Sequence, residues 1–459
     1  MEIETRILKN QYHDSVALML ASRTLRESEG VADAAFIMGT DANKELLKQG
    51  GLLTKEAETA RANDLIITIK CDADATHLLD KAEKLLKERA AKTGEVSYTA
   101  RTMRAALLED PLLNLAVISV AGAYAAREAR EALAGGLHVL LFSDNVSLDD
   151  EIALKKLALE RGLLLMGPGA GTAIINGVGL GFANAVPRGK IGIVSAAGTG
   201  LQEVSTLAAK HGAGISQAIG TGGRDLSESV GGLTFFAAVD ALMADPATEV
   251  LALVSKPPDR EVKGRLLDKL RGTKKKVVLC LLGAETQDEA IENLVFTRTL
   301  EECAFAAADV QSDASREDLA PLIADWKGRF SEKQRFIRGL FSGGTLCYEA
   351  QVIWQDALKD PVLSNAPVDK KNRMPDSMRS SGHSAVDLGE EEFTVGRPHP
   401  MIDNELLIRR MKEEAKDPAV AVIMLDVVIG YGAHENPAAE LGEAVQEIWK
   451  ELKLSLIHI

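Results

Sequence analysis

Two stretches of the chain, GKIGIVSAAGTGLQE (residues 190–204) and FIRGLFSGGTLCYE (residues 336–349), share one pattern. In each, an apolar run typical of a buried strand ends in a loop of Ser, Gly and Thr, and a helical pattern begins at once. Each helical region leads to Asp-Pro-Ala, at 245–247 and again at 417–419, and a new apolar strand follows. Repetition of a strand, a loop and a helix predicts two related α/β modules rather than one continuous sheet.

Both loops are candidate anion sites. The first N–H groups of a helix have no partner within the helix, and the helix dipole favours negative charge there. A single turn of this kind is often only tight packing, but its repetition in equivalent places favours a shared phosphate or acyl-phosphate centre. The residues that we predict to bind the phosphate are Ser195, Gly198, Thr199, Gly200, Ser342, Gly343, Gly344 and Thr345.

Three side chains are candidates for catalysis. Glu203 and Glu349 follow the two loop threonines by one helical turn, so each could orient a reacting group, or could be an ordinary solvated helix residue. His399 lies between two prolines in GRPHP, and its pKa near neutrality suits a proton carrier or a nucleophile. The alternative for His399 is an exposed histidine in a rigid turn.

A glycine-rich loop, GTGGRD, follows the strand SQAIG at the carboxyl end of the predicted parallel sheet. Ligands of such folds bind at this edge, so Gly222 and Gly223 are candidate contacts of a bound cofactor. Alternatively, the loop uses glycine only to reach positive φ.

Composition and charge narrow the class of protein. The 459 residues predict roughly three domains of about 150 residues. A net charge of −14 argues against non-specific binding of nucleic acid. The four cysteines are scattered without a paired motif, so no metal site is evident and a reducing cytoplasmic location is expected. No apolar run reaches the ~20 residues that a membrane span needs.

Periodicity predicts an α/β protein with several domains. Residues 1–95 are expected to form a small α+β domain, either ferredoxin-like or a partial nucleotide-binding fold, and 90–104 a linker. A Rossmann-like domain (105–188), a first module (189–284), a helical connector (285–332) and a second module (333–453) follow. The polar stretch 362–394 reads as a structureless insertion in the second module. We expect 454–459 (LSLIHI) to be a non-native tail that replaces the natural C-terminus, because it fits no helix or stop signal.

Together these residues resemble the succinyl-CoA synthetase superfamily, and most closely its FdrA branch. Residues 115–282 resemble the synthetase α-subunit through SVAG, SDNVSLDDE, MGPGAGT, IGIVSAAGTG and GTGGRDL. GTLCYE resembles the Gly-Thr-Leu-x-Tyr-Glu motif of an α-subunit phosphate loop. It lies in a module that is similar to the C-terminal domain of the β-subunit. The stretch GRPHPMID is similar to that of FdrA proteins, so the resemblance covers nearly the whole chain.

The resemblance implies a Rossmann-like domain followed by two flavodoxin-like modules, in which the two loops hold a phosphorylated intermediate. It also implies that the Rossmann-like unit, with Ser143, Gly167 and Pro168, descends from a coenzyme A site. Two departures argue against a complete ligase. The synthetase has a Gly-His-Ala-Gly loop whose histidine carries the phosphoryl group, whereas this chain has AETQDEAIENL after VVLCLLG. The chain also has no recognisable ATP-grasp region.

FdrA-type proteins are associated with purine and allantoin catabolism and resemble a subunit of oxamate carbamoyltransferase. The resemblance therefore implies acyl or carbamoyl transfer from a small anionic substrate, carbamoyl phosphate or coenzyme A, with other protein subunits as partners and neither nucleic acid nor membrane. One alternative is an NDP-forming acyl-CoA ligase component in which His399 replaces the missing phosphohistidine. Another is a non-catalytic scaffold or regulatory subunit.

Overall fold

The computed structural model describes residues 2–11, 15–26, 28, 30–40, 43–44, 47–48, 51–72, 75–92, 100, 102–283, 291–310, 320–327, 329–394 and 398–452. The chain divides into an N-terminal unit (1–99 and 395–398) and a second unit (100–394 and 399–459). The expected tail at 454–459 and most of the expected linker lie outside the described residues. In the described part, none of the helices combines the length with the hydropathy that a bilayer span requires.

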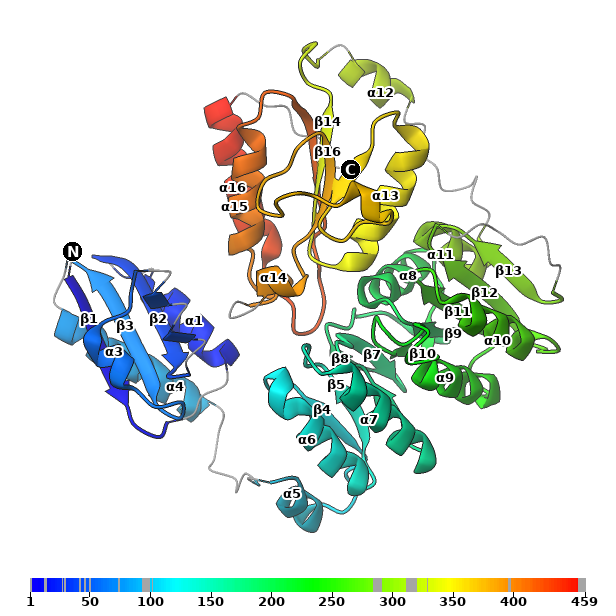
Figure 1. Cartoon of the computed structure of the whole chain (residues 1–459), viewed down its shortest axis with the longest axis horizontal. Coiled ribbons are helices and arrows are strands. Elements are labelled where there is room, and N and C mark those ends of the chain that lie inside the picture. Colours follow the sequence, from blue (N-terminus) through cyan, green and yellow to red (C-terminus); the bar gives the residue numbers. More distant parts are fainter. Residues whose placement is uncertain are drawn as a thin grey trace. The chain divides into compact units, whose positions relative to one another are not determined.

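The N-terminal unit is a small α+β sandwich (Figure 1). Its elements are β1 (Glu2–Leu8), α1 (Ser15–Arg26), β2 (Val31–Met38), α3 (Lys55–Thr59), β3 (Leu65–Cys71) and α4 (Ala75–Lys92). The central strand β3, LIITIKC, pairs antiparallel with both neighbours. It is buried because α1 and α4 cover one face of the sheet, while Leu47, Leu52, Ala57 and Ala60 cover the other. A nucleotide-binding unit would have parallel strands instead.

The second unit begins with a short helix and a Rossmann-like sheet of three parallel strands, in the order β4-β5-β6. Its elements are α5 (Met103–Glu109), β4 (Leu115–Ile118), α6 (Gly122–Ala134), β5 (His138–Leu141), α7 (Leu148–Glu160) and β6 (Leu165–Met166). Alanines on α6 pack against the apolar strands. The alternation of strands with helices that the sequence predicts is therefore the one observed.

The first module holds a seven-stranded sheet in the order β13-β12-β11-β9-β10-β7-β8. Its elements are β7 (Thr172–Ile175), β8 (Val178–Gly181), β9 (Arg188–Ser195), α8 (Gly198–Lys210), β10 (Ile215–Gly220), α9 (Leu233–Ala244), β11 (Val250–Ser255), α10 (Arg260–Leu270), β12 (Lys276–Leu281), β13 (Leu294–Thr297) and α11 (Leu300–Ala308). The strands from β13 to β10 are parallel, and β7 and β8 add an antiparallel hairpin.

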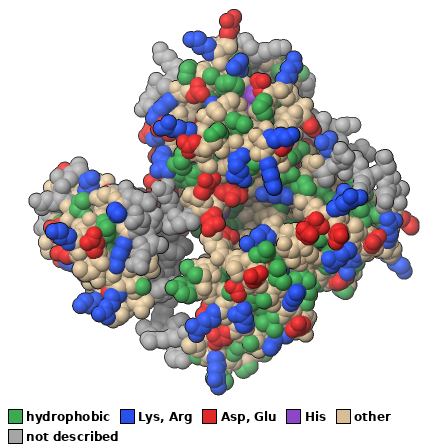
Figure 2. All heavy atoms as spheres, viewed as in Figure 1, with side chains coloured by type: hydrophobic (Ala, Val, Ile, Leu, Met, Phe, Trp, Pro, Cys, Tyr) green, Lys and Arg blue, Asp and Glu red, His purple; other side chains and the backbone are tan. Residues whose placement is uncertain are grey.

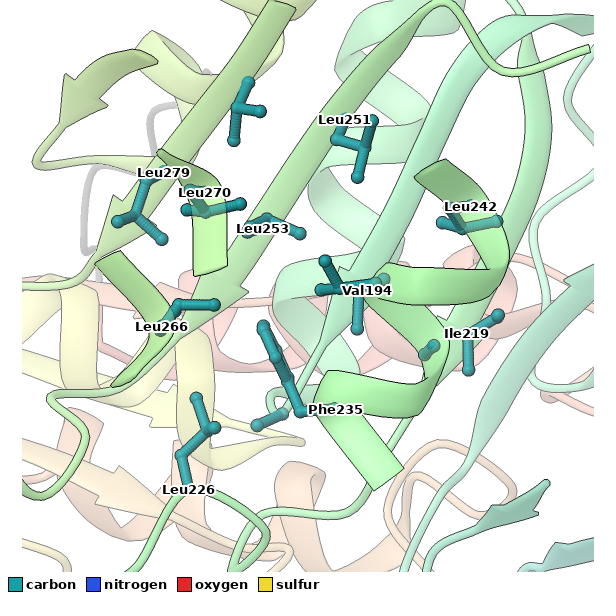
Figure 3. Close-up of a cluster of buried hydrophobic side chains, with 14 of the residues drawn as sticks. Val194, Ile219, Leu226, Phe235, Leu242, Leu251, Leu253, Leu266, Leu270 and Leu279 are labelled. Atoms are coloured by element: carbon teal, nitrogen blue, oxygen red, sulfur yellow. The ribbon is translucent and has the colours of Figure 1, made fainter. Parts of the chain in front are cut away.

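Helices cover both faces of this sheet. On one face, side chains of β9, β11 and β12 meet those of α9 and α10, with Phe235 fully buried among Val194, Leu253 and Leu266 (Figure 3). On the other face, α8 and α11 pack against the same strands. Each fully buried apolar side chain of this size contributes about 1.5–3 kcal/mol to stability. This core fixes the strand ends from which the site residues project.

The module is longer than predicted. The boundaries 189 and 284 left out the hairpin of β7 and β8, which pairs with β10, and the strand β13, which pairs with β12. Residues 285–332 are therefore not a purely helical connector, although α11 and α12 (Ala320–Lys327) lie within them. The strands were missed because four-residue runs show too little periodicity, and sheet pairing decides their conformation.

The second module has four parallel strands in the order β15-β16-β14-β17. Its elements are β14 (Phe336–Phe341), α13 (Gly344–Ala357), β15 (Val362–Ser364), η2 (Lys370–Asn372), β16 (His383–Asp387), α14 (Glu391–Thr394), α15 (Glu405–Ala415), β17 (Val420–Leu425) and α16 (Pro437–Leu452). Helices α15 and α16 pack on one face and α13 on the other (Figure 1).

The stretch 362–394 is not a structureless insertion, because it supplies two strands of this sheet. The strand β16, HSAVD, is buried along its whole length between β14 and β15. Because it contains polar residues, its sequence lacks the apolar pattern of a buried strand. These residues have hydrogen-bond partners inside the module: the guanidinium of Arg338, for example, donates to Ser384 Oγ at 3.4 Å. The predicted fold class, a Rossmann-like unit and two flavodoxin-like modules after a small α+β domain, is confirmed.

Candidate functional site

The two repeated loops lie against each other. A Cβ atom built on Gly200 would lie 2.9 Å from Thr345 Cγ2, and one built on Gly343 would overlap Thr199 Cγ2. The first turns of α8 and α13 are therefore in contact. In the space-filling view a hollow lies between the two modules, with acidic and basic side chains around it (Figure 2). The structure thus brings together the two loops that the sequence singled out.

Neither helix has a side-chain cap. The N-cap residues are Ala197 and Gly343, both with extended backbone and neither able to offer a side-chain oxygen to the first turn. The first-turn N–H groups of both helices are consequently left for another acceptor. The hydroxyl of Thr199 is also unsatisfied, because Oγ1 is buried without a hydrogen-bond partner among the described residues and the residue is only 4% exposed. Such a set of donors suits an anion.

The two predicted serines end the strands just before these helices. Ser195 Oγ donates to Ala197 O at 2.7 Å and accepts from Ala197 N at 3.1 Å, so this hydroxyl holds the turn. The backbone N–H of Ser342 donates to Asp426 Oδ1 at 2.7 Å. Both serines are buried. Their predicted contact with phosphate would require these hydrogen bonds to be shared or exchanged.

Three charged side chains that the sequence interpretation missed converge on the start of α13. Lys256, Asp387 and Asp426 each follow or end a parallel strand, β11, β16 and β17. A Cβ atom built on Gly344 would lie 2.5 Å from Asp387 Oδ2 and 3.0 Å from Lys256 Nζ. The rule that ligands bind at the carboxyl ends of parallel strands could have pointed to all three.

Both aspartates have raised pKa values. Burial raises the pKa of Asp387 to about 7, against the opposing effect of Lys256, and the carboxylates of Glu390 and Asp426 raise it further. Burial also raises the pKa of Asp426 to about 6, although hydrogen bonds from Ser342 lower it. The second oxygen of Asp426 is inaccessible and has no partner in the described structure. These carboxyl groups can therefore exchange protons near neutral pH.

His399 lies beside Asp387. A Cβ atom built on Gly389 would lie 3.1 Å from His399 Nε2 and 3.2 Å from Asp387 Oδ1. The ring centroid lies 5.8 Å from that of Phe182, with the two rings tilted by 37°, and burial lowers the pKa of His399 to about 4. Nδ1 accepts the N–H of Met401 at 3.3 Å, which assigns the hydrogen of the neutral ring to Nε2. In this arrangement the Nε2–H group of His399 is available as a hydrogen-bond donor.

Glu203 and Glu349 lie one turn behind the helix N-termini. Burial raises the pKa of both carboxyl groups, that of Glu349 to about 7, and Glu203 adds to the shift of Glu349. Glu349 Oε1 accepts the N–H of Leu300, the first residue of α11, at 2.6 Å. Glu349 thus joins α13 to α11, and its predicted role in orienting a reacting group stays a prediction.

The residues expected from a coenzyme A site gather at the carboxyl edge of the Rossmann-like sheet. Ser143 Oγ accepts the N–H of Val120 at 3.0 Å. A Cβ atom built on Gly222 would lie 2.6 Å from Pro168 O and close to Gly167. Gly223 is exposed, with no atom within 4 Å of such a Cβ. Four of the five residues therefore pack around strand ends, and Gly223 alone of the five faces open space.

The polar end of GTGGRD has a structural role that the sequence did not show. Lys155 Nζ lies 2.7 Å from Asp225 Oδ1 and 2.9 Å from Glu151 Oε1, with all three side chains buried. Arg224 Nη2 lies 2.9 Å from Glu151 Oε2. Asp225 Oδ2 also accepts the N–H of Phe235, at the start of α9. The loop is thereby attached to α7 of the Rossmann-like unit.

The N-terminal residues 1–102 match the family described as AllF, heavy metal-associated domain. The described residues contain no group of three or more His, Cys, Asp or Glu side chains that could hold a metal ion. The one cysteine among residues 1–102 is Cys71, which is 2% exposed at the end of β3. The described residues therefore do not fit a heavy-metal site.

Residues 340–457 match the family described as CoA-ligase. The α-subunit of ADP-forming succinate–CoA ligase from Aquifex aeolicus (strain VF5) is 32% identical over 147 residues, 31% of this chain and 47% of that protein. Among solved structures, ATP citrate lyase of Methanosaeta concilii (D541A mutant) with (3S)-citryl-CoA is 17% identical, with a TM-score of 0.35 over 46% of this chain and 38% of that chain. A likeness of this size supports no functional argument.

The Escherichia coli (strain K12) protein YahF, described as uncharacterized, is 47% identical over 457 residues. This similarity extends over 97% of the present chain and 88% of YahF. The similarity to the succinate–CoA ligase α-subunit supports the wider superfamily but does not single out its FdrA branch. The chain therefore belongs to the family of YahF.

Proposed function

We propose that this protein transfers an acyl or carbamoyl group through an acyl phosphate held where α8 and α13 meet. The observation that carries the proposal is the contact of two uncapped helix N-termini around the unpartnered hydroxyl of Thr199. Backbone N–H groups fixed in this way stabilise the charge of a phosphate and position its acyl group without reorganisation.

The finer part of the proposal follows from the sequence resemblance. The protein would be an FdrA-type subunit of an oxamate carbamoyltransferase complex in allantoin and purine catabolism, with carbamoyl phosphate as the activated substrate and other subunits as partners. The absence of a histidine in AETQDEAIENL supports this choice, because transfer from a preformed acyl phosphate needs no phosphohistidine.

The second candidate is an NDP-forming acyl-CoA ligase component in which His399 carries the phosphoryl group. The position of His399 next to Asp387 favours it. Nε2 would have to lose its hydrogen before attack, and we infer that the nearby carboxylate of Asp387 accepts it. Replacing His399 by Asn decides this role, since unchanged turnover in the assembled complex would exclude His399 as an essential carrier.

The test is the melting temperature of the protein titrated separately with carbamoyl phosphate and with coenzyme A. A ligand that binds only the folded state stabilises it by RT ln(1 + [L]/Kd). We expect a rise with carbamoyl phosphate that Thr199→Val abolishes, and that the control Thr206→Val on the same helix retains. A rise with coenzyme A alone would favour the ligase.

A third outcome would favour a scaffold subunit. If Ser195, Thr199, Ser342 and Thr345 can all become Ala without loss of activity in the assembled complex, the helix N-termini do not act on a substrate. In that case the fold would be retained for assembly.

A further inference from the structure

Lys256 lies at the start of α13, on the same side of Gly344 as the carboxylate of Asp387, but forms no direct ion pair with it. Within the described part of the chain its ammonium group has no ion pair and no hydrogen bond, and its contact is the ring of Tyr348, with Nζ 5.7 Å from the ring centroid. This half-buried ammonium lies at the uncapped N-terminus of α13 and makes no hydrogen bond of its own among the described residues. It is therefore available to a bound anion.

Asp387 presents its two carboxylate oxygens to different neighbours. Oδ1 accepts the N–H of Gly389 at 2.9 Å and lies on the side of His399. Oδ2 is directed to the start of α13, on the side of Lys256 and Gly344. Glycine at 344 and at 389 keeps this space open, since a Cβ atom at either position would approach the carboxylate.

We propose that Lys256 binds the phosphate group of the substrate and that Asp387 exchanges the proton of the attacking nucleophile. This inference rests on the proposed function, and it adds two residues and their roles to that site. It also gives the orientation of the bound substrate. The phosphate lies between the helix N-termini and Lys256, and the reacting carbonyl lies on the side of Asp387.

These groups account for every bond, electron pair and proton in the proposed transfer. The nucleophile forms a bond to the carbonyl carbon, and the bond between that carbon and the phosphate oxygen breaks, leaving its electron pair on the phosphate. The proton of the nucleophile passes to Asp387. Lys256 and the helix N–H groups stabilise the charge that develops on the leaving phosphate. In the reverse direction Asp387 returns the proton.

The surroundings of Asp387 determine how it responds to a bound anion. The groups that face it are Lys256, Glu390, Asp426 and the neutral ring of His399. A phosphate bound to Lys256 offsets the attraction of that cation and adds negative charge beside the carboxylate. Both effects raise the affinity of Asp387 for a proton. Phosphate binding should therefore be coupled to proton uptake at this residue.

The experiment is isothermal titration of the full chain with inorganic phosphate at pH 7.5 in two buffers of different ionisation enthalpy. The dependence of the heat on the buffer gives the number of protons taken up. Because phosphate itself exchanges protons, the decisive quantity is the difference between wild type and Asp387→Asn. Lys333→Met and Glu435→Gln, at exposed positions, are the matched controls.

We expect Lys256→Met to weaken phosphate binding by about tenfold or more. Asp387→Asn should bind phosphate at least as tightly as wild type but take up fewer protons. Equal affinity in Lys256→Met, or equal proton uptake in Asp387→Asn, would overturn the inference while leaving the phosphate site intact. If the wild-type protein binds neither phosphate nor carbamoyl phosphate, the proposed function fails as well.

Discussion

Thr199, in the first turn of α8, packs directly against Gly343, the N-cap residue of α13. The two residues come from the two repeated loops, in which Thr199 matches Thr345 and Gly343 holds the N-cap position of Ala197. Their contact joins the modules at the point where both helices expose unpaired N–H groups. The position that a Cβ atom would take on Gly343 is already filled by the Thr199 side chain, so this contact depends on glycine.

Replacing Gly343 by Ala should separate the two helix N-termini. Overpacking of this kind costs about 1–3 kcal/mol. We expect a lower melting temperature and loss of stabilisation by carbamoyl phosphate. The control is Gly264→Ala in α10, where a Cβ atom meets nothing within 4 Å. Equal behaviour of both variants would show that the contact does not matter.

Replacing Lys155 by Met should destabilise the second unit strongly. The change leaves the buried carboxylates of Glu151 and Asp225 without their shared cation. Removing one partner of a buried ion pair costs about 3–5 kcal/mol. Denaturant unfolding measures the loss, and Lys156→Met, at the exposed neighbouring position, should be nearly neutral. A small effect at Lys155 would mean that water replaces the ammonium.

Glu349→Gln should change how stability depends on pH. The pKa of Glu349 is raised to about 7 in the folded state, so the folded protein binds more protons than the unfolded chain between about pH 4 and pH 7. Its contribution to stability therefore falls as pH rises through that window. The variant should be more stable than wild type at pH 8, by about 1–2 kcal/mol, and should keep the Leu300 hydrogen bond.

Melting curves from pH 4 to pH 8 test this expectation. Glu443→Gln, at an exposed position of α16, should leave the profile unchanged. A Glu349→Gln profile parallel to that of wild type would show that burial does not control this carboxyl group.

The contribution of His399 to stability should change with pH in the opposite direction to that of Glu349. Burial lowers its pKa to about 4, so between about pH 4 and pH 6.5 the unfolded chain binds more protons than the folded protein. The stability contributed by His399 rises with pH through this window. His399→Asn should therefore reduce the difference between the melting temperatures at pH 5 and pH 7, whereas His77→Asn, at an exposed position, should not. An unchanged difference in His399→Asn would argue against a buried neutral ring.

All four cysteines should resist alkylation in the native protein. Cys71, Cys280, Cys303 and Cys347 are thiols, and all four are buried. Burial also raises the pKa of Cys347, so little of the reactive thiolate is present at neutral pH. Mass spectrometry after iodoacetamide should show no labelled cysteine until denaturant is added. Rapid labelling of any one of them would locate a local opening of its module.

Much of the fold could be predicted because it depends on local patterns. The apolar strands before Ser195 and Ser342 and the helices after them are encoded in short stretches with clear periodicity. The strand β16 escaped prediction because its polar side chains, among them His383 and Ser384, are satisfied by partners elsewhere in the module. β13 escaped because sheet pairing, and not its own four residues, decides its conformation.

The candidate site also has a part that local sequence predicts and a part that it does not. The sequence by itself determined the repeat and the two Gly-rich helix starts with Thr199 and Thr345, and hence the prediction of two anion-binding turns. Only the tertiary structure decided that these turns touch, and that Lys256, Asp387 and His399 meet beside them. The physical reason is that a helix N-terminus is a property of one short segment. The convergence of a cation, a carboxylate and a neutral ring requires strand ends from two separate sheets to be packed together.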